Sequence, residues 1–225
     1  MSNSTFSVIT LDGPAGAGKG TVASLVANKL GWRLLDSGIL YRLTALAAMR
    51  QGVPLDDEAS LADLAEHMPV DFTPSGRVMI PGTDEEQSQI RAEQVGKNAA
   101  LVAKLPQVRQ ALLLKQRGCA AAPGLVAEGR DMGTVVFPGA RFKFFLTANV
   151  EERAQRRYLQ LRNSDAAVSL GRVLADLVER DEQDSSRSLA PLRQASDAVL
   201  LDSTGRSADQ VVEQLMGFLR DQGLE

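Results

Sequence analysis

The sequence has very few side chains of the kinds that hold zinc or act as thiol or imidazole catalysts. It contains one cysteine, Cys119, and one histidine, His67, among 225 residues. With so few, neither a disulfide framework nor a zinc site nor a Ser-His triad is available. Cys119 stands before three alanines, which indicates inert packing, and His67 ends a polar helical stretch, which indicates an exposed side chain.

Long hydrophobic runs and a strong net charge are also missing. No apolar stretch approaches the roughly 20 residues that span a bilayer, and residues 1–5 lack the charged region of a signal peptide. The net charge is −3, so no general basic field would hold nucleic acid or an anionic membrane. We therefore expect a cytoplasmic, monomeric protein without nucleic-acid or membrane partners, in which any bound anion is met by local arginines.

The most informative stretch that is present is a glycine-dense turn near the N-terminus. It follows an apolar, β-branched run at residues 6–11 and precedes residues 22–27, which repeat with helical period. Strand, glycine turn and helix are the context of a phosphate-binding loop, whose backbone N–H groups surround a phosphate at the start of a helix. The residues that we expect to bind ATP phosphates here are Gly13, Pro14, Ala15, Gly16, Ala17, Gly18, Lys19, Gly20 and Thr21.

The lysine of this loop predicts binding of a nucleoside triphosphate. Lys19 would supply a mobile full charge for the β and γ phosphates. Gly20 occupies the position after the lysine where Ser or Thr is usual, and Thr21 follows one place later. Thr21 is therefore the candidate ligand for the Mg²⁺ that accompanies ATP. The competing interpretation is a glycine-rich turn that opens an ordinary α/β unit.

The rest of the chain alternates short apolar runs with helical periodicity. Strands are expected at residues 31–36, 125–127, 142–146 and 198–201, and helices at 39–51, 56–67, 90–117 with a break before Pro106, 150–161, 169–182 and 208–219. This order predicts an α/β fold with a parallel sheet covered on both faces. Alternation around proline-glycine turns at residues 70–88 indicates an antiparallel β-hairpin insertion.

Four arginines point to the nature of the phosphoryl acceptor. They lie beside small or acidic residues at element ends, and they are Arg42, Arg130, Arg180 and Arg187. Guanidinium groups match phosphate oxygens bidentately, so several in one cleft suit an acceptor that is itself a phosphate. A phosphate monoester is largely dianionic at neutral pH and needs no catalytic base. Positioning and charge neutralisation would then suffice for phosphoryl transfer.

The chain resembles the bacterial cytidylate kinases nearly from end to end. The segments that carry the resemblance are the loop at residues 13–21, Leu35-Asp36-Ser37-Gly38 with Tyr41-Arg42, Gly129-Arg130-Asp131-Met132-Gly133-Thr134-Val135-Val136-Phe137-Pro138, Arg180-Asp181 with Asp184 and Arg187, and residues 198–202. The resemblance implies a P-loop three-layer fold around five parallel strands. It implies one domain with a core (1–36, 118–156, 188–225), a monophosphate-binding region carrying the insertion (37–117) and a short lid (157–187).

The resemblance also implies roles for individual residues in transfer of the γ-phosphoryl group of ATP to CMP or dCMP. Lys19, Arg130, Arg180 and Arg187 would be catalytic, and Arg157 would reach the ATP phosphates. The CMP-binding residues would be Ser37, Arg42, Arg109, Arg130, Asp131, Arg180, Asp184 and Arg187. The same helix face carries Arg153 and Arg156, for which a solvated basic face is a comparable interpretation.

The implied base-reading residues make physical sense for cytosine. Cytosine offers an N4 amino donor that matches the carboxylate of Asp131, and its N3 and O2 suit Arg109. Uracil would instead face Asp131 acceptor to acceptor, which should cost about 1–3 kcal/mol or more. Ala100 stands where family members can place a serine near the base.

Two other functions fit parts of the sequence. Another small P-loop kinase could act on AMP, UMP or a hydroxyl acceptor, and in the last case Asp36 would be the candidate base. A GTP-dependent switch protein would need a guanine-reading Asn-Lys-x-Asp sequence after a strand. The nearest match, residues 28–31, lacks the aspartate and ends the first helix.

Overall fold

The computed structural model describes residues 7–69, 71, 89–162 and 168–224. Its described residues separate into two compact units. The first unit comprises Ser7 and the described residues of 31–125, and the second unit comprises Val8–Leu30 and the described residues of 126–224. Each unit is described by itself below.

The strands form the parallel sheet that the sequence predicts. They are β1 (Ser7–Asp12), β2 (Arg33–Asp36), β3 (Gly124–Gly129), β4 (Phe142–Thr147) and β5 (Val199–Asp202). The sheet has five strands in the order β2-β3-β1-β4-β5. Ile9 of β1 lies opposite Phe142 of β4, and Phe144 of β4 lies opposite Val199 of β5, both in parallel register. The predicted five-stranded parallel core is confirmed.

The central strands β1 and β4 are buried, but only one face of each is consistently apolar. Ile9 and Leu11 of β1 and Phe144 and Leu146 of β4 are each at most 1% exposed, and residues two apart lie on the same face of a strand. The other face also carries buried polar side chains, Thr10 at 0% and Lys143 at 6% exposed. Phe144 also meets Phe218 edge to face at 5.5 Å, so it anchors a helix to the sheet.

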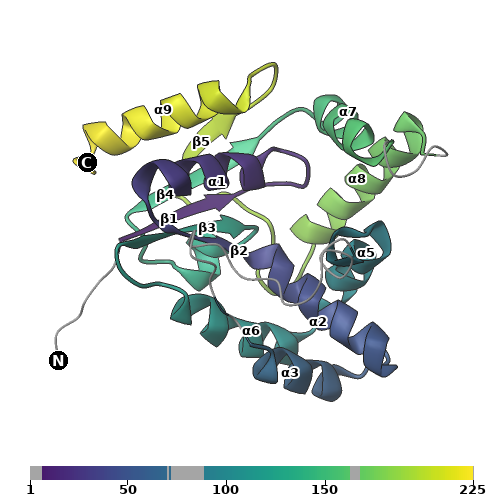
Figure 1. The fold of residues 1–225 in the computed structure, drawn as a ribbon. Helices are drawn as coiled ribbons and strands as arrows, with labels where there is room; N and C mark the ends of the chain where they lie inside the picture. Colours follow the sequence, from purple (N-terminus) through teal and green to yellow (C-terminus); the bar gives the residue numbers. More distant parts are fainter. Residues whose placement is uncertain (1–6, 70, 72–88, 163–167, 225) are drawn as a thin grey trace, which may run out of the picture. The chain divides into compact units, whose positions relative to one another are not determined.

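The described part of the second unit contains four α-helices. They are α1 (Lys19–Leu30), α7 (Val150–Leu161), α8 (Leu170–Ser185) and α9 (Ala208–Asp221). Figure 1 shows α1 and α9 running along the sheet beside β1, β4 and β5, and α7 next to α8. Serine or asparagine caps three of these helices, since Asn149, Ser169 and Ser207 accept a backbone N–H at the start of α7, α8 and α9.

The first unit is mainly helical in its described part. Its helices are α2 (Ser37–Gln51), α3 (Glu58–His67), α5 (Glu93–Val102) and α6 (Pro106–Gly118). Asp36 caps α2 through the N–H of Ile39, and Gly52 ends it in the left-handed conformation. α2 packs on α3 and α5, and α3 packs on α6 (Figure 1). Pro106 begins α6, as its sequence predicts.

One element was not predicted, a five-residue π-helical turn, η1 (Met132–Val136). The carbonyl of Asp131 accepts the N–H groups of Val135 and Val136, at 2.8 and 3.1 Å. A single wide turn has no repeated hydrophobic period, so the pattern of the sequence does not reveal it. β3 is also longer than predicted and includes Glu128 and Gly129.

Two of the predicted regions fall partly or wholly outside the described residues. The antiparallel hairpin at residues 70–88 is outside them, apart from residue 71. Of the lid at residues 157–187, the structure describes all but 163–167. The division into core, monophosphate-binding region and lid stays a prediction.

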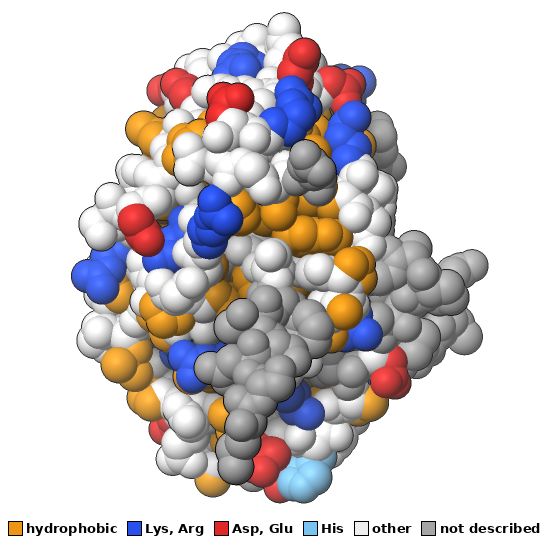
Figure 2. All heavy atoms as spheres, turned by 90° about the vertical axis from the view of Figure 1, so that its left-hand side faces the viewer, with side chains coloured by type: hydrophobic (Ala, Val, Ile, Leu, Met, Phe, Trp, Pro, Cys, Tyr) orange, Lys and Arg blue, Asp and Glu red, His pale blue; other side chains and the backbone are white. Residues whose placement is uncertain are grey.

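The single histidine and the single cysteine lie where the sequence predicts. His67 has a side chain that is 73% exposed, and Figure 2 shows the histidine in pale blue at the surface. Cys119 is buried, and burial raises its thiol pKa to about 11, so the predicted inert packing is confirmed. On the face in Figure 2, basic and acidic side chains are interspersed. Among the described residues, no helix is both long and apolar enough to cross a bilayer.

Candidate active site

The glycine-rich loop connects β1 to α1 and has the backbone conformation that its sequence predicts. Gly13, Gly16 and Gly18 have φ angles of 150°, 77° and 94°, which side chains rarely adopt. A Cβ added at Gly13 would lie 2.0 Å from the carbonyl oxygen of Leu146 in β4. The loop can therefore lie against the end of β4 only with glycine at this position.

We expect Gly13→Ala to lower the free energy of unfolding by about 2–4 kcal/mol, from left-handed strain and the overlap with Leu146. Gly31→Ala is the matched control, since Gly31 also has a positive φ but a Cβ there would meet nothing within 4 Å. Urea unfolding of both variants measures the difference. Equal losses in the two would show that the Leu146 contact carries no cost.

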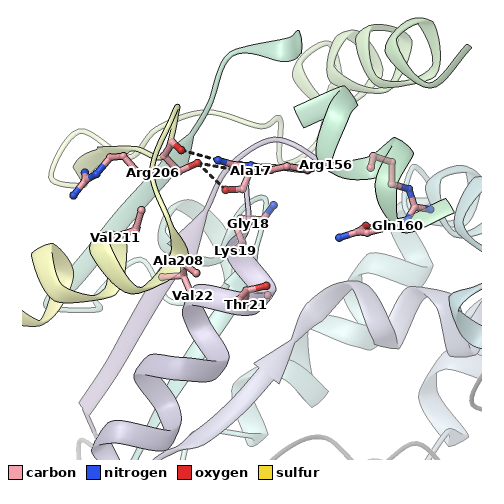
Figure 3. Close-up of a pocket in the computed structure, with 14 residues that line it drawn as sticks. Ala17, Gly18, Lys19, Thr21, Val22, Arg156, Gln160, Arg206, Ala208 and Val211 are labelled. Atoms are coloured by element: carbon pink, nitrogen blue, oxygen red, sulfur yellow. Dashed lines mark hydrogen bonds between the residues drawn. The ribbon is translucent and has the colours of Figure 1, made fainter. Parts of the chain in front are cut away.

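A pocket opens beside this loop within the second unit. It has a volume of about 410 Å³. Its lining residues come from the loop and α1, from α7, from the segment that joins β5 to α9, and from α9 itself, and they are Gly16, Ala17, Gly18, Lys19, Gly20, Thr21, Val22, Arg156, Arg157, Gln160, Ser203, Arg206, Ala208 and Val211. Figure 3 shows these elements surrounding the start of α1. Three arginines and one lysine make it a pocket for an anion.

Arg156 forms one wall of the pocket. Its guanidinium donates to the hydroxyl and the carbonyl of Ser203, at 3.0 and 2.7 Å (Figure 3). The same guanidinium also pairs with Glu152. Ser203 in turn donates to the carbonyl of Ala17 in the loop, at 3.1 Å. This chain of hydrogen bonds ties α7 to the loop through the residue that follows β5.

Arg153 is buried, so the interpretation of α7 as a solvated basic face is wrong for this residue. Its side chain is 7% exposed and donates to the loop carbonyl of Ala15 at 3.0 Å and to that of Ala148 at 3.0 Å. It also forms an ion pair with Asp181 of α8, at 2.7 Å. Helical spacing placed Arg153 and Arg156 on one face, but that face packs against the loop rather than against water.

Lys19 is the first residue of α1 and is only 6% exposed. Its ammonium donates to the carbonyl of Pro14 at 2.8 Å. Burial, together with the positive charge of Arg130, lowers the pKa of Lys19 to about 7. A buried ammonium among other cations is favoured when an anion binds beside it.

Arg130 and Arg187 are held by the same carboxylate. Arg130 Nε donates to Asp184 Oδ2 at 2.8 Å, and Arg187 Nη2 pairs with Asp184 Oδ1. Asp184 is 2% exposed. Burial would raise the pKa of this carboxyl, but the charges of Arg130 and Arg187 outweigh it and hold the pKa below its usual range. Asp184 therefore holds two guanidinium groups, and the charges of Glu128 and Asp181 also act on Arg130.

Arg180 belongs to the same group of charges. Its charge lowers the pKa values of both Lys19 and Asp184. The Nε atom of Arg187 is buried without a hydrogen-bond partner among the described residues. The second unit therefore brings four cationic side chains together with the carboxylates of Asp184, Glu128 and Asp181, and its guanidinium groups suit the crowded negative charge of phosphoryl transfer.

Two buried carboxylates lie near the loop and the turn that follows β3. Asp131, before η1, is 5% exposed. Glu128, in β3, is 8% exposed, and its Oε1 lies 3.0 Å from where a Cβ on Gly20 would be. This contact explains the glycine after Lys19, because a serine or threonine there would crowd Glu128.

The remaining predicted site residues belong to the first unit. Ser37 is 5% exposed at the start of α2. Arg42 donates to the carbonyls of Ile90 and Ala92, at 2.8 and 3.2 Å. Arg109 donates to the carbonyl of Ala103 at 3.2 Å and lies over the ring of Tyr41 at 5.9 Å.

The sequence matches known proteins along nearly its whole length. The model of the family described as cytidylate kinase matches residues 9–221. The chain is 53% identical over 226 residues to the cytidylate kinase of Pseudomonas paraeruginosa (strain DSM 24068 / PA7), covering 98% of each protein. The chain belongs to the cytidylate kinase family. It is also 54% identical over 219 residues to the cytidylate kinase of Pseudomonas fluorescens (strain Pf0-1), with 95% of each covered.

The fold of this family member is shared with a far more distant solved structure. An uncharacterized protein from Eubacterium ventriosum ATCC 27560 aligns with a TM-score of 0.54, at 11% identity, over 96% of this chain and 99% of that one. At such low identity the likeness shows the fold alone.

For a cytidylate kinase family member, the described structure groups most of the predicted residues of the second unit. Hydrogen bonds, ion pairs and charge effects connect Lys19, Arg130, Arg180, Asp184 and Arg187. Arg157 lines the pocket beside the loop. Sequence reasoning missed several residues at the loop and pocket, namely Asp12, Glu128, Gln160, Ser203 and Arg206. Of these, Glu128 carried a usable signal, because it ends an apolar strand run.

Proposed function

We propose that this chain transfers the γ-phosphoryl group of ATP to CMP or dCMP, giving ADP and CDP or dCDP. The observation that carries the proposal is its 53% identity, over 98% of the chain, to a protein named cytidylate kinase. The loop, the pocket and the cationic group of the second unit supply the chemistry. The alternative acceptors AMP and UMP are disfavoured, because the matched relatives are named for cytidylate.

ATP would bind with its phosphates on the glycine-rich loop. The backbone N–H groups at the start of α1 point toward such an anion, and Lys19 would leave Pro14 to meet the β and γ phosphates. Arg157 is half-buried at the pocket, where it can follow the phosphate chain. Arg156 and Arg206 also line the pocket, with Arg156 Nη1 3.9 Å from where a Cβ on Gly18 would be, and both would contact ATP.

The acceptor phosphate would be held by arginines rather than activated by a base. Its dianion is already a nucleophile at neutral pH, so the barrier is the approach of two negative charges. Arg130 and Arg187, fixed by Asp184, would lower that barrier, with Arg180 acting on the transferring group. Arg42 would contribute a further contact to the acceptor phosphate.

Asp184 and Asp131 would have different roles toward the nucleoside. Both oxygens of Asp184 already accept from arginines, so any contact to the ribose would add to these bonds. Asp131 would accept the N4 amino group of cytosine. By the family resemblance, Arg109 would donate to the base and Ser37 would also bind CMP.

Mg²⁺ fits the chemistry of the residues beside Lys19. Thr21 supplies a hydroxyl at the pocket, and Glu128 Oε1 fills the space next to Gly20, so these two would hold the ion. Among the described residues, no three His, Cys, Asp or Glu side chains form a cluster that could hold a metal. This agrees with an ion that takes most of its ligands from substrate phosphates and water. When bound, it would neutralise charge on the β and γ phosphates.

The test is a panel of monophosphates with ATP and Mg²⁺, monitored by ADP release. We expect turnover with CMP and dCMP, and a kcat/KM for UMP that is lower by about 10-fold or more. Asp131→Asn should lower kcat/KM for CMP and bring the CMP to UMP ratio toward one, since an amide can donate to uracil O4. Asp221→Asn, at the exposed end of α9, is the control. Faster turnover of AMP or UMP than of CMP would reject the proposed base, and GTP hydrolysis without a monophosphate would reject the kinase.

A further inference from the structure

Asp12 makes a long-range contact that the proposed reaction does not yet use. It is the last residue of β1, directly before Gly13, and is 4% exposed. Its Oδ1 accepts the N–H of Met132 at 2.8 Å, and its Oδ2 accepts the N–H of Gly133 at 2.7 Å. Both carboxylate oxygens therefore hold the backbone of the turn η1.

This contact replaces the usual cap of a helical turn. Asp131 stands at the N-cap position of η1 yet makes no side-chain cap hydrogen bond. Aspartate at that position ordinarily accepts from the N–H groups two or three residues later. Here Asp12 accepts from the first two residues of the turn instead, so the start of η1 is fixed by a different element of the fold.

The packing around the turn shows that the approach is close. A Cβ added at Gly133 would lie 2.9 Å from Thr10 Oγ1 and 3.4 Å from Asp12 Oδ2. Only glycine lets the backbone at this position come near enough to β1 for the hydrogen bond. Burial raises the pKa of Asp12 to about 6 although the two N–H bonds lower it, so these bonds offset only part of the free-energy cost of burying the carboxylate.

We propose that Asp12 is a positioning residue that fixes the turn carrying Arg130 and Asp131 to the end of β1, and so holds the acceptor-binding side chains in register with the glycine-rich loop. The proposal rests on the proposed roles of Arg130 and Asp131. Asp12 itself touches neither substrate. Its loss should therefore impair use of CMP, and selection against UMP, more than it impairs binding of ATP.

The test uses Asp12→Asn in the full chain. Asparagine keeps one acceptor oxygen and turns an amino group toward the other N–H, so one of the two bonds is lost. We expect kcat/KM for CMP to fall about 10- to 100-fold, the CMP to UMP ratio to fall, and the KM for ATP to stay within about twofold. Amide hydrogen exchange at residues 132 and 133 should become faster, which reports on the bonds independently of activity.

Thr10→Val is the matched control. Thr10 lies two residues earlier in β1, and its hydroxyl is buried beside the same turn without a hydrogen-bond partner. Valine has the same shape, so the kinetics and the amide exchange should stay as in the parent. Gly133→Ala perturbs the hydrogen bond to Asp12 from the side of η1, and it should reproduce the selective loss of kcat/KM for CMP. This second variant keeps the test decisive if Asp12→Asn folds poorly.

The outcomes separate this proposal from the proposed function. Suppose that the parent enzyme turns over CMP and that Asp12→Asn shows faster amide exchange at residues 132 and 133. If its kcat/KM for CMP and its CMP to UMP ratio are then unchanged, the positioning role is overturned and the kinase activity stands. An equal rise in the KM values for ATP and CMP also overturns it, because Asp12 would then support the loop in general. A parent without CMP turnover would reject the proposed function itself.

Discussion

Arg130→Met should lower kcat with CMP and ATP about 1,000-fold, with a smaller change in the KM for ATP. Arg130 Nε is held by Asp184 at 2.8 Å, so its guanidinium is oriented before substrates bind. A charge that is already in place stabilises the transferring phosphoryl group without reorganisation, and methionine keeps the stem but removes that charge. Steady-state kinetics with ATP and CMP measure the loss.

Two further variants show whether the loss comes from the guanidinium itself. Arg130→Lys keeps the charge without the fork and should recover only part of the rate. Arg141→Met is the control, since Arg141 is exposed and contacts Phe142 and the carbonyl of Gln222. Arg130→Met also leaves Asp184 with one arginine fewer, so its thermal unfolding must be compared with the parent. A rate in Arg130→Met within about threefold of the control would contradict a catalytic role.

The parts of the fold that the sequence predicts are those with a local pattern. The loop was predicted because strand, glycines, Lys19 and helix lie within one short stretch, and the φ angles of Gly13 and Gly16 agree with it. α7 was predicted to its ends because Asn149 caps it and the helical period is unbroken. The buried strands β1 and β4 were predicted because each is a mostly apolar run.

The parts that were missed depend on contacts between residues distant in sequence. Asp12 meets Met132 across 120 residues, and Ser203 meets Ala17 across 186. Nothing around Asp12 in the sequence distinguishes a buried carboxylate that binds a distant turn from an ordinary residue at the end of a strand. The surroundings of Arg153 were left open for the same reason, since its partner Ala15 lies 138 residues away. Helical spacing gives the face of a side chain but not what packs against that face.

The cationic group shows an intermediate case. The sequence suggested that Arg130, Arg180 and Arg187 act together because of the residues beside them, and the structure shows what orders two of them, the carboxylate of Asp184. Asp184 was predicted to bind CMP, and this stays a prediction; in the structure both of its oxygens accept from arginines. Pairing of this kind is a property of the folded site, because it needs β3 and α8 to bring their ends together.

Lys19→Met should lower kcat about 1,000-fold, because the mobile charge that meets the β and γ phosphates is lost while the loop backbone remains. Lys29→Met is the control, since Lys29 lies exposed in the last turn of the same helix. Kinetics at saturating CMP separate the rate from the KM for ATP. A loss no larger than that of the control would contradict the role of Lys19.

The same variant should also change how stability depends on pH in metal-free, nucleotide-free buffer. Lys19 has a pKa of about 7 in the folded protein against an ordinary value of 10.5. Below pH 7 the Lys19 side chain is charged in both the folded and the unfolded state, so the full free-energy cost of burying the charge opposes folding. Between pH 7 and 10.5 only the unfolded state keeps the proton, so this group makes the parent more stable as pH rises.

Lys19→Met should be more stable than the parent near pH 6, and this difference in stability should shrink toward pH 10, as measured by thermal unfolding of both proteins. A stability advantage that is constant with pH would mean that Lys19 keeps its proton in the folded state. The lysine would then be charged before ATP binds, rather than gaining its proton when ATP binds.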